Sequence, residues 1–212
     1  MLTRIPMTDY FALLNEPRRP WIDVEELKEK FLALSSEFHP DRFHSASAEE
    51  KESANRRYTD LNAAHACLRE PKERLRHLLE LEQGAKPEDL QNIPVEMTEL
   101  FMEVGQLCRE VDLFLSEKAG ITSPLLKVEV FERGLEWNDK LKSLQERIGA
   151  QREWLVQELI SLNEAWTLPP KTDGSGRSGA LPLERIESIY RVFSYTNRWS
   201  AQIQERRFRL SL

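Results

Sequence analysis

The sequence predicts an all-α protein built from two helical parts, and three observations lead to this fold class. Apolar residues recur every three or four positions along most of the chain, which is the period of a helix with one buried face. Glycine and proline are few, at 8 and 11 in 212 residues, and most fall between the periodic segments. We find no convincing strand pattern and no internal repeat.

The first part is expected to span residues 1–84, beginning with a short helix capped by Thr8 or Asp9. Asp23 can cap a second helix, with Glu26 in the capping-box position three residues later. Its apolar residues are spaced by three and four, which places them on one face. They are Val24, Leu27, Phe31, Leu34 and Phe38.

Pro40 must end this helix, because proline lacks an N–H and restricts the residue before it. A turn is expected over residues 39–47, and a second stripe with the same period follows it. The stripe comprises Ala54, Tyr58, Leu61, His65 and Leu68. Two striped helices joined by a short loop should pack as an antiparallel hairpin. A fourth helix is expected to open at Pro71 and to end at Gly84.

Residues 85–95 are expected to form a linker, and residues 96–212 a bundle of about three long helices with a mobile loop at 168–181. One predicted helical stretch exceeds forty residues, which is long for a single helix, so we expect a break near Gly134 or at residues 137–139. The predicted helices cover residues 97–115, 125–166 and 183–203.

The net charge of −6 disfavours nonspecific binding to nucleic acid or to an anionic membrane surface, so neither is an expected partner. Residues 169–212 carry eight basic and four acidic groups, whereas residues 91–168 carry eight and 14. The basic segment is expected to pack on the acidic one; a basic tail for nucleic acid is the alternative. The start has no apolar segment with a cleavage site, and Cys67 and Cys108 are the only thiols, so we expect a cytoplasmic protein.

No metal, cofactor or catalytic site is predicted. His39 with His44, or His65 with Cys67, could be imagined as metal ligands, but neither pair has a third convergent ligand. The sequence contains no glycine-rich phosphate loop and no nucleophile elbow. An enzyme is therefore the least supported class of function.

His39, Pro40 and Asp41 lie where the hairpin loop must lie. Because proline and aspartate are common in turns, a purely structural turn is one interpretation. The order of segments nevertheless resembles a J domain over roughly residues 8–82. The matching segments are "DYFALLN", "FHPDRF", "YTDLNAAHACLREP" and "KERLRHLLELE".

The phrase "LNAAHACLREPKERLRHLLEL" is similar to one subgroup, the HscB co-chaperones of iron–sulfur cluster assembly. In that subgroup a three-helix bundle that binds the cluster scaffold protein follows the J domain. The stretch "ELFMEVGQLCREV" resembles the start of that bundle. The resemblance implies two partners, a DnaK/HscA-class chaperone whose ATP hydrolysis is accelerated and an iron–sulfur scaffold protein (IscU-like).

The resemblance also implies which residues bind each partner. The chaperone-binding residues would be His39, Pro40, Asp41, Arg42, Lys28 and Lys30. The two lysines could equally lie on a solvated helix face without a role. The scaffold-binding residues would be Phe101, Met102 and Tyr195, although core packing alone could explain Phe101.

The scaffold face departs from the family pattern at three positions. Gly105, Gln106 and Arg109 stand where the family has apolar and acidic side chains. Either the scaffold has co-adapted, or the protein is a J-domain adaptor whose bundle binds a different client.

Overall fold

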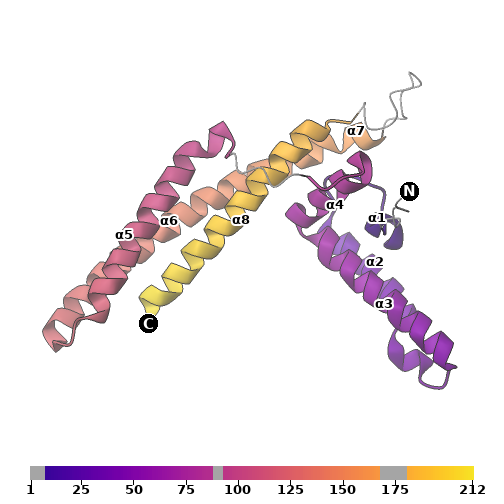
Figure 1. Ribbon diagram of the computed structural model, residues 1–212, viewed down its shortest axis with the longest axis horizontal. Coiled ribbons are helices and arrows are strands. Elements are labelled where there is room, and N and C mark those ends of the chain that lie inside the picture. The colour runs from indigo at the N-terminus through magenta and orange to yellow at the C-terminus, as the bar shows by residue number, and fades with distance from the viewer. Residues whose placement is uncertain (1–7, 88–92, 168–180) are drawn as a thin grey trace, which may run out of the picture. The chain divides into compact units, whose positions relative to one another are not determined.

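The computed structural model describes residues 8–87, 93–167 and 181–212, and within these ranges every regular element is a helix (Figure 1). The predicted all-α fold class is thereby confirmed. The chain forms two compact units. Unit 1 comprises Met1–Asp89 and Glu158–Tyr190, and unit 2 comprises Leu90–Gln157 and Arg191–Leu212. Residues 88–92 of the expected linker and 168–180 of the expected loop lie outside the described residues.

Unit 1 begins with four α-helices and one 3₁₀ turn. They are α1 (Tyr10–Leu13), α2 (Val24–Glu37), η1 (Pro40–Phe43), α3 (Ala48–Arg69) and α4 (Pro71–Gln83). Asp9 and Asp23 cap α1 and α2 by accepting backbone N–H bonds. Ser47 and Glu50 form a reciprocal capping box at the start of α3. Gly84 ends α4 with φ 72°, a left-handed conformation that glycine adopts without strain.

The core of unit 1 confirms the predicted helical hairpin. α3 contacts α1, α2, α4 and η1. Leu27 of α2 and Ala54, Leu61 and Leu68 of α3 are buried, as the two stripes require, whereas Val24 at the start of the predicted α2 stripe is 45% exposed. Phe31 stacks on His65 across the hairpin, with ring centroids 4.3 Å apart. Apolar side chains of α1, of its C-cap Leu14 and of α4 complete this core; they are Phe11, Leu14, Leu75, Leu78 and Leu79.

The end of unit 1 opposite η1 holds buried polar side chains that we call the buried base, defined by Arg74 and His77 of α4. Arg74 is 2% exposed, and its guanidinium donates to the backbone oxygens of Pro20 (2.9 Å) and Leu68 (2.6 Å). Burial lowers the pKa of Arg74 to about 10, so the side chain still carries its charge at pH 7. His77 Nε2 accepts the Tyr10 N–H at 3.1 Å. These bonds join α4 to α1, to α3 and to the segment before α2.

Unit 2 contains most of three long helices. They are α5 (Thr98–Ala119), α6 (Pro124–Leu162) and α8 (Leu183–Ser211); the short elements are η2 (Val95–Met97), in unit 2, and α7 (Glu164–Thr167), in unit 1. Glu103 of α5 pairs with Arg147 of α6, and Phe114 of α5 meets Trp137 of α6, so these two helices are antiparallel. α8 runs parallel to α5, since Phe101 meets Trp199 and Lys118 donates to the backbone oxygen of Leu210.

The predicted packing of the basic segment on the acidic one is confirmed in unit 2. Arg206 of α8 pairs with Asp112 of α5 at 2.6 Å, and Arg209 approaches the same carboxylate at 3.5 Å. In addition, Arg207 donates to the side chain of Gln145 of α6 at 2.7 Å.

The predicted break in α6 was wrong, because one helix runs from Pro124 to Leu162. Asn138 does not cap a new helix; its side-chain oxygen accepts from Arg207 of α8 at 3.0 Å. Gly134 lies close to the ring of Phe114, where an added Cβ would be 3.8 Å from the nearest ring atom. A glycine inside a helix costs about 1 kcal/mol relative to alanine, and the packing of α6 on α5 and α8 outweighs this cost.

Candidate partner-binding sites

The His-Pro-Asp segment forms the tip of the α2–α3 hairpin, and each of its residues has a local role. His39 is the N-cap of η1, with Nδ1 accepting the Asp41 N–H at 3.3 Å. Pro40 occupies the first position of the turn, where its missing N–H costs no hydrogen bond. The His39 ring packs edge-on against Tyr58 of α3, with centroids 5.5 Å apart. These contacts fix the backbone from which Asp41 projects.

The Asp41 carboxylate is widely exposed, with 90% of its side chain accessible. Its nearest cationic candidate is His39 Nδ1, at 3.6 Å. The same nitrogen accepts the Asp41 N–H, and no lysine or arginine of the described residues pairs with the carboxylate. The Asp41 side chain is therefore exposed without a lysine or arginine partner.

The predicted basic residues of the chaperone site separate into two kinds. Lys28 is exposed and has only a surface pair with Glu25, at 3.1 Å. Lys30 instead binds Glu16, whose side chain is 0% exposed, at 2.5 Å. Arg42 folds back and donates to the backbone oxygen of Ser36 at 3.3 Å. The structure thus places Lys28 and Arg42 on the surface, and it gives Lys30 a structural ion pair.

The sequence reasoning missed Arg57 as a cation at the tip. Its guanidinium lies over the ring of Phe38, 5.7 Å from the centroid, and no carboxylate of the described residues pairs with it. The sequence could have placed Arg57 near the tip, because Arg57 precedes Tyr58, a residue of the predicted α3 stripe that faces the end of α2. Arg57 adds a positive charge close to the tip.

Two of the three predicted scaffold-binding residues meet through one buried aromatic residue. Phe101 of α5 and Tyr195 of α8 both contact Trp199, with ring centroids 6.2 and 5.8 Å away. Trp199 is 3% exposed, whereas Phe101 is 39% exposed and Tyr195 is half-buried under the guanidinium of Arg198. Met102, the third residue, is 62% exposed on the outer side of α5. We call the surface formed by Phe101, Met102 and Tyr195 the α5–α8 face.

Gly105, Gln106 and Arg109 do not act alike on α5. A Cβ at Gly105 would lie 3.6 Å from Arg109 Nη1, so the arginine folds over the position that the glycine leaves empty. Arg109 is exposed, and among the described residues no carboxylate forms an ion pair with it. The α5–α8 face therefore carries an uncompensated positive charge.

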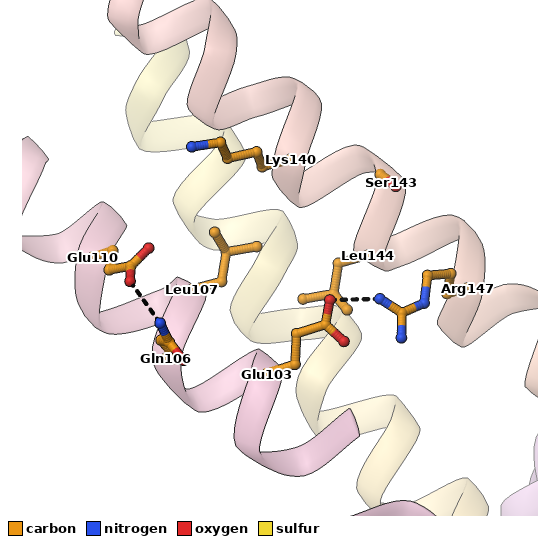
Figure 2. Close-up of a pocket in the computed structure, with 8 residues that line it drawn as sticks. All are labelled: Glu103, Gln106, Leu107, Glu110, Lys140, Ser143, Leu144 and Arg147. Carbon is orange, nitrogen blue, oxygen red and sulfur yellow. Dashed lines mark hydrogen bonds and ion pairs between the residues drawn. The ribbon is translucent and has the colours of Figure 1, made fainter. Parts of the chain in front are cut away.

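Gln106, one helical turn after Met102, lines a groove of about 370 Å³ between α5 and α6 (Figure 2). Its amide donates to Glu110 at 3.0 Å, while Glu103 and Arg147 pair across the groove. The floor is apolar, formed by Leu107 and Leu144. Because its charged walls already pair within the protein, this groove is a weaker candidate site than the α5–α8 face.

Neither cysteine has the environment of a reactive thiol. Burial raises the pKa of Cys67 to about 11, and its Sγ donates to the backbone oxygen of Glu73 at 3.5 Å. Burial also raises the pKa of Cys108. Within the described residues, no group of three His, Cys, Asp or Glu side chains could hold a metal ion. In the same part of the chain, no helix is both long and apolar enough to cross a membrane.

An exposed His-Pro-Asp turn that joins two antiparallel helices gives the first four helices of unit 1 the fold of a J domain. Comparisons with known proteins sharpen this class, although no family model matches the chain. The co-chaperone HscB homolog of Haemophilus ducreyi is 36% identical over 78 residues, which are 37% of this chain and 45% of that relative. The HscB homolog of Neisseria meningitidis is 38% identical over 73 residues, or 34% of this chain and 44% of the relative.

The matched part is therefore less than half the length of these curated relatives, whereas the similarity of fold extends further. The structure of the chaperone HscB from Vibrio cholerae matches with a TM-score of 0.59 at 19% identity, and the aligned residues are 93% of this chain and 96% of that protein. The structure of human co-chaperone HscB matches with a TM-score of 0.60 at 20% identity, and the aligned residues are 95% of this chain and 83% of the human protein. The resemblance to HscB-type J-domain co-chaperones is thus confirmed.

Proposed function

We propose that this protein is a co-chaperone that stimulates ATP hydrolysis by a DnaK-class chaperone and delivers an iron–sulfur cluster scaffold protein to it. In this role the chain binds two partners and catalyses no reaction itself. The co-chaperone role is taken from the names of the similar proteins. The tip in unit 1 and the α5–α8 face in unit 2 support its extension to this chain. A cytoplasmic location stays a prediction.

The observation that carries the chaperone half is the exposed, uncompensated carboxylate of Asp41 on a fixed turn. An arginine of the chaperone could pair with it, while Arg42 and Arg57 add positive charge at the tip and Lys28 adds one farther along α2. Truncating one partner of a desolvated charge pair costs about 2–5 kcal/mol. One residue could therefore decide whether the chaperone is stimulated.

The test is the rate of ATP hydrolysis by the DnaK-class chaperone of the same organism, with increasing amounts of the full chain. Asp41→Asn should require at least about thirtyfold more protein for the same stimulation, or give none, because it removes the charge without changing the shape. Glu49→Gln, which neutralises another exposed carboxylate at the start of α3, is the matched control and should behave as wild type. Equal stimulation by Asp41→Asn and wild type would remove the chaperone half of the proposal.

The scaffold half is supported by the exposed Phe101 and Met102 and by the half-buried Tyr195. We expect the organism's own scaffold protein to bind the full chain, and Met102→Ser to weaken that binding at least tenfold. Phe208→Ser on α8 is the control, since it removes an apolar side chain that is similarly exposed, at 64%. Calorimetric titration gives both affinities. No binding of a folded scaffold at high micromolar concentration would contradict this half.

The second candidate function is a J-domain adaptor whose bundle binds a different client. The free charge of Arg109, folded over Gly105, favours it, because the family has acidic and apolar side chains on this face. Arg109→Glu discriminates between the two functions. A co-adapted scaffold should bind wild type more tightly than the variant, whereas a scaffold that prefers the variant would favour the adaptor.

A further inference from the structure

The first turns of α6 carry an apolar surface that the fold of unit 2 does not use. Val128, Phe131 and Leu135 are 60%, 65% and 51% exposed, and their spacing of three and four places them on one face of the helix. The core of unit 2 takes a different face of α6, formed by Val130, Leu141, Leu144 and Ile148. A second apolar stripe of this kind on a long helix marks a surface for a partner.

A groove lies directly beside this stripe. Its volume is about 250 Å³, and Phe131 and Leu135 share its lining with Val130 of α6 and Leu210 of α8. Its polar neighbours already have partners, since Lys118 donates to the backbone oxygen of Leu210 and Arg207 donates to Asn138. An apolar side chain entering the groove would therefore leave these polar groups paired.

The other side of the stripe is acidic. Glu129, Glu132, Glu136 and Asp139 are exposed, follow one another along α6, and form no ion pair within the described residues. Arg133 does not neutralise them, because it pairs with Glu117 and lies over the ring of Phe114. A partner lying along the stripe would thus meet apolar groups in the middle and four carboxylates on one side.

We propose that Val128, Phe131 and Leu135 with the adjoining groove form a docking site for a basic amphipathic helix of another protein. Apolar side chains spaced by three, four and seven residues would fill the groove and cover Phe131, as in other helix-in-groove complexes. Lysines or arginines on one flank of that helix would meet the four carboxylates. A second copy of this chain fits less well, since antiparallel pairing of two α6 stripes would bring acidic flank against acidic flank.

The probe for the test is a synthetic 16-residue helical peptide with leucines along one face and lysines on both flanks. A peptide with glutamate at every lysine position is its charge control. Fluorescence anisotropy gives the affinity for the full chain, and hydrogen exchange locates the site. We expect the lysine peptide to bind at least tenfold more tightly than the glutamate peptide, with protection at residues 125–139 and 207–211.

Two sets of variants tie the binding to this site. Phe131→Ser should weaken the lysine peptide at least tenfold, and Glu132→Lys with Glu136→Lys should reverse the preference between the peptides. Trp154→Ser and Glu153→Lys change an exposed apolar residue and an exposed acid elsewhere on α6, and they should leave the affinity within twofold. Circular dichroism checks the fold of each variant.

Three outcomes would overturn the proposal. They are no binding of the lysine peptide at 1 mM, equal loss in the control variants, and protection outside the named residues. Sedimentation of the free chain tests the other occupant, because a dimer that Phe131→Ser converts to a monomer would assign the stripe to self-association. The two partners of the proposed function are tested at other residues, so either proposal can fail without the other.

Discussion

The tip and the buried base of unit 1 are both polar, but the carboxylate of the tip is exposed without a lysine or arginine partner, whereas the polar groups of the base are buried and hydrogen-bonded. At the tip, Asp41 is 90% exposed and its charge is unmatched. At the base, Arg74 is 2% exposed and donates to two backbone oxygens, and His77 is 4% exposed and accepts a backbone N–H. The contrast teaches that the polar groups of the base hold the hairpin in place, whereas the carboxylate of the tip is open to solvent and, in the proposed function, to the chaperone. Changes at the base should therefore alter stability, and changes at the tip should alter function.

The largest expected effect on stability is that of Arg74→Met. Methionine keeps most of the volume but leaves the backbone oxygens of Pro20 and Leu68 buried without donors. Each unsatisfied buried group costs about 1–3 kcal/mol, so the free energy of unfolding of unit 1 should fall by about 2–6 kcal/mol. Urea unfolding followed by circular dichroism measures this change. A loss below about 1 kcal/mol would show that the buried bonds do not hold the base together.

A smaller effect should separate Lys30 from Lys28. Lys30→Met removes a cation from the buried carboxylate of Glu16, which keeps only Arg19, at 3.2 Å. We expect a loss of about 1–3 kcal/mol in unfolding free energy, because a buried acceptor loses a charged donor. Lys28→Met should leave stability nearly unchanged, since surface pairs contribute little.

The same pair of variants should behave in the opposite way toward the chaperone. Lys28→Met should weaken docking severalfold, with the difference from wild type disappearing at high salt. A folded Lys30→Met protein should dock as wild type does. If Lys30→Met weakened docking more than Lys28→Met, Lys30 would belong to the chaperone site as the sequence predicted.

The smallest expected effect is a dependence of stability on pH. Burial lowers the pKa of His77; the nearby Arg18 and Arg76 lower it further, and Asp9 opposes them. The folded state therefore binds fewer protons than the unfolded state, whose histidine pKa is about 6.5. Stability should be full above that value and should fall as the pH decreases from about 6.5 toward the lowered pKa of the folded state.

Urea unfolding between pH 8 and pH 5 measures this slope. His77→Phe should flatten it, because phenylalanine cannot take up a proton, although His65 also has a pKa lowered by burial and leaves part of the slope. An identical slope in wild type and His77→Phe would contradict the assignment.

The sequence alone predicted the fold class, the hairpin and the position of the tip, because these features are local. A stripe with helical period and a proline that ends a helix can be identified within a few turns of chain. The roles of Arg74 and Lys30 could not be predicted, since their partners, Pro20 and Glu16, come from another segment. The unbroken α6 was also missed, because its continuity rests on contacts with α5 and α8.

The α5–α8 face lies between these two cases. Its residues were inferred from a resemblance, and Trp199 explains how Phe101 and Tyr195 are held together across 94 positions of sequence. The folding of Arg109 over Gly105 was not foreseen, since a glycine and an arginine four residues apart look unrelated until the helix is formed. Departures from a family pattern can thus be coupled in space.

One paired measurement tests most directly the claim that the tip stimulates the chaperone and that the base stabilises unit 1. Chaperone ATP turnover and urea unfolding are measured on Asp41→Asn and Arg74→Met, at a temperature where both proteins are folded. Asp41→Asn should lose stimulation and keep the wild-type free energy of unfolding, whereas Arg74→Met should lose stability and keep stimulation. The reverse pattern, or full stimulation by Asp41→Asn, would contradict the account.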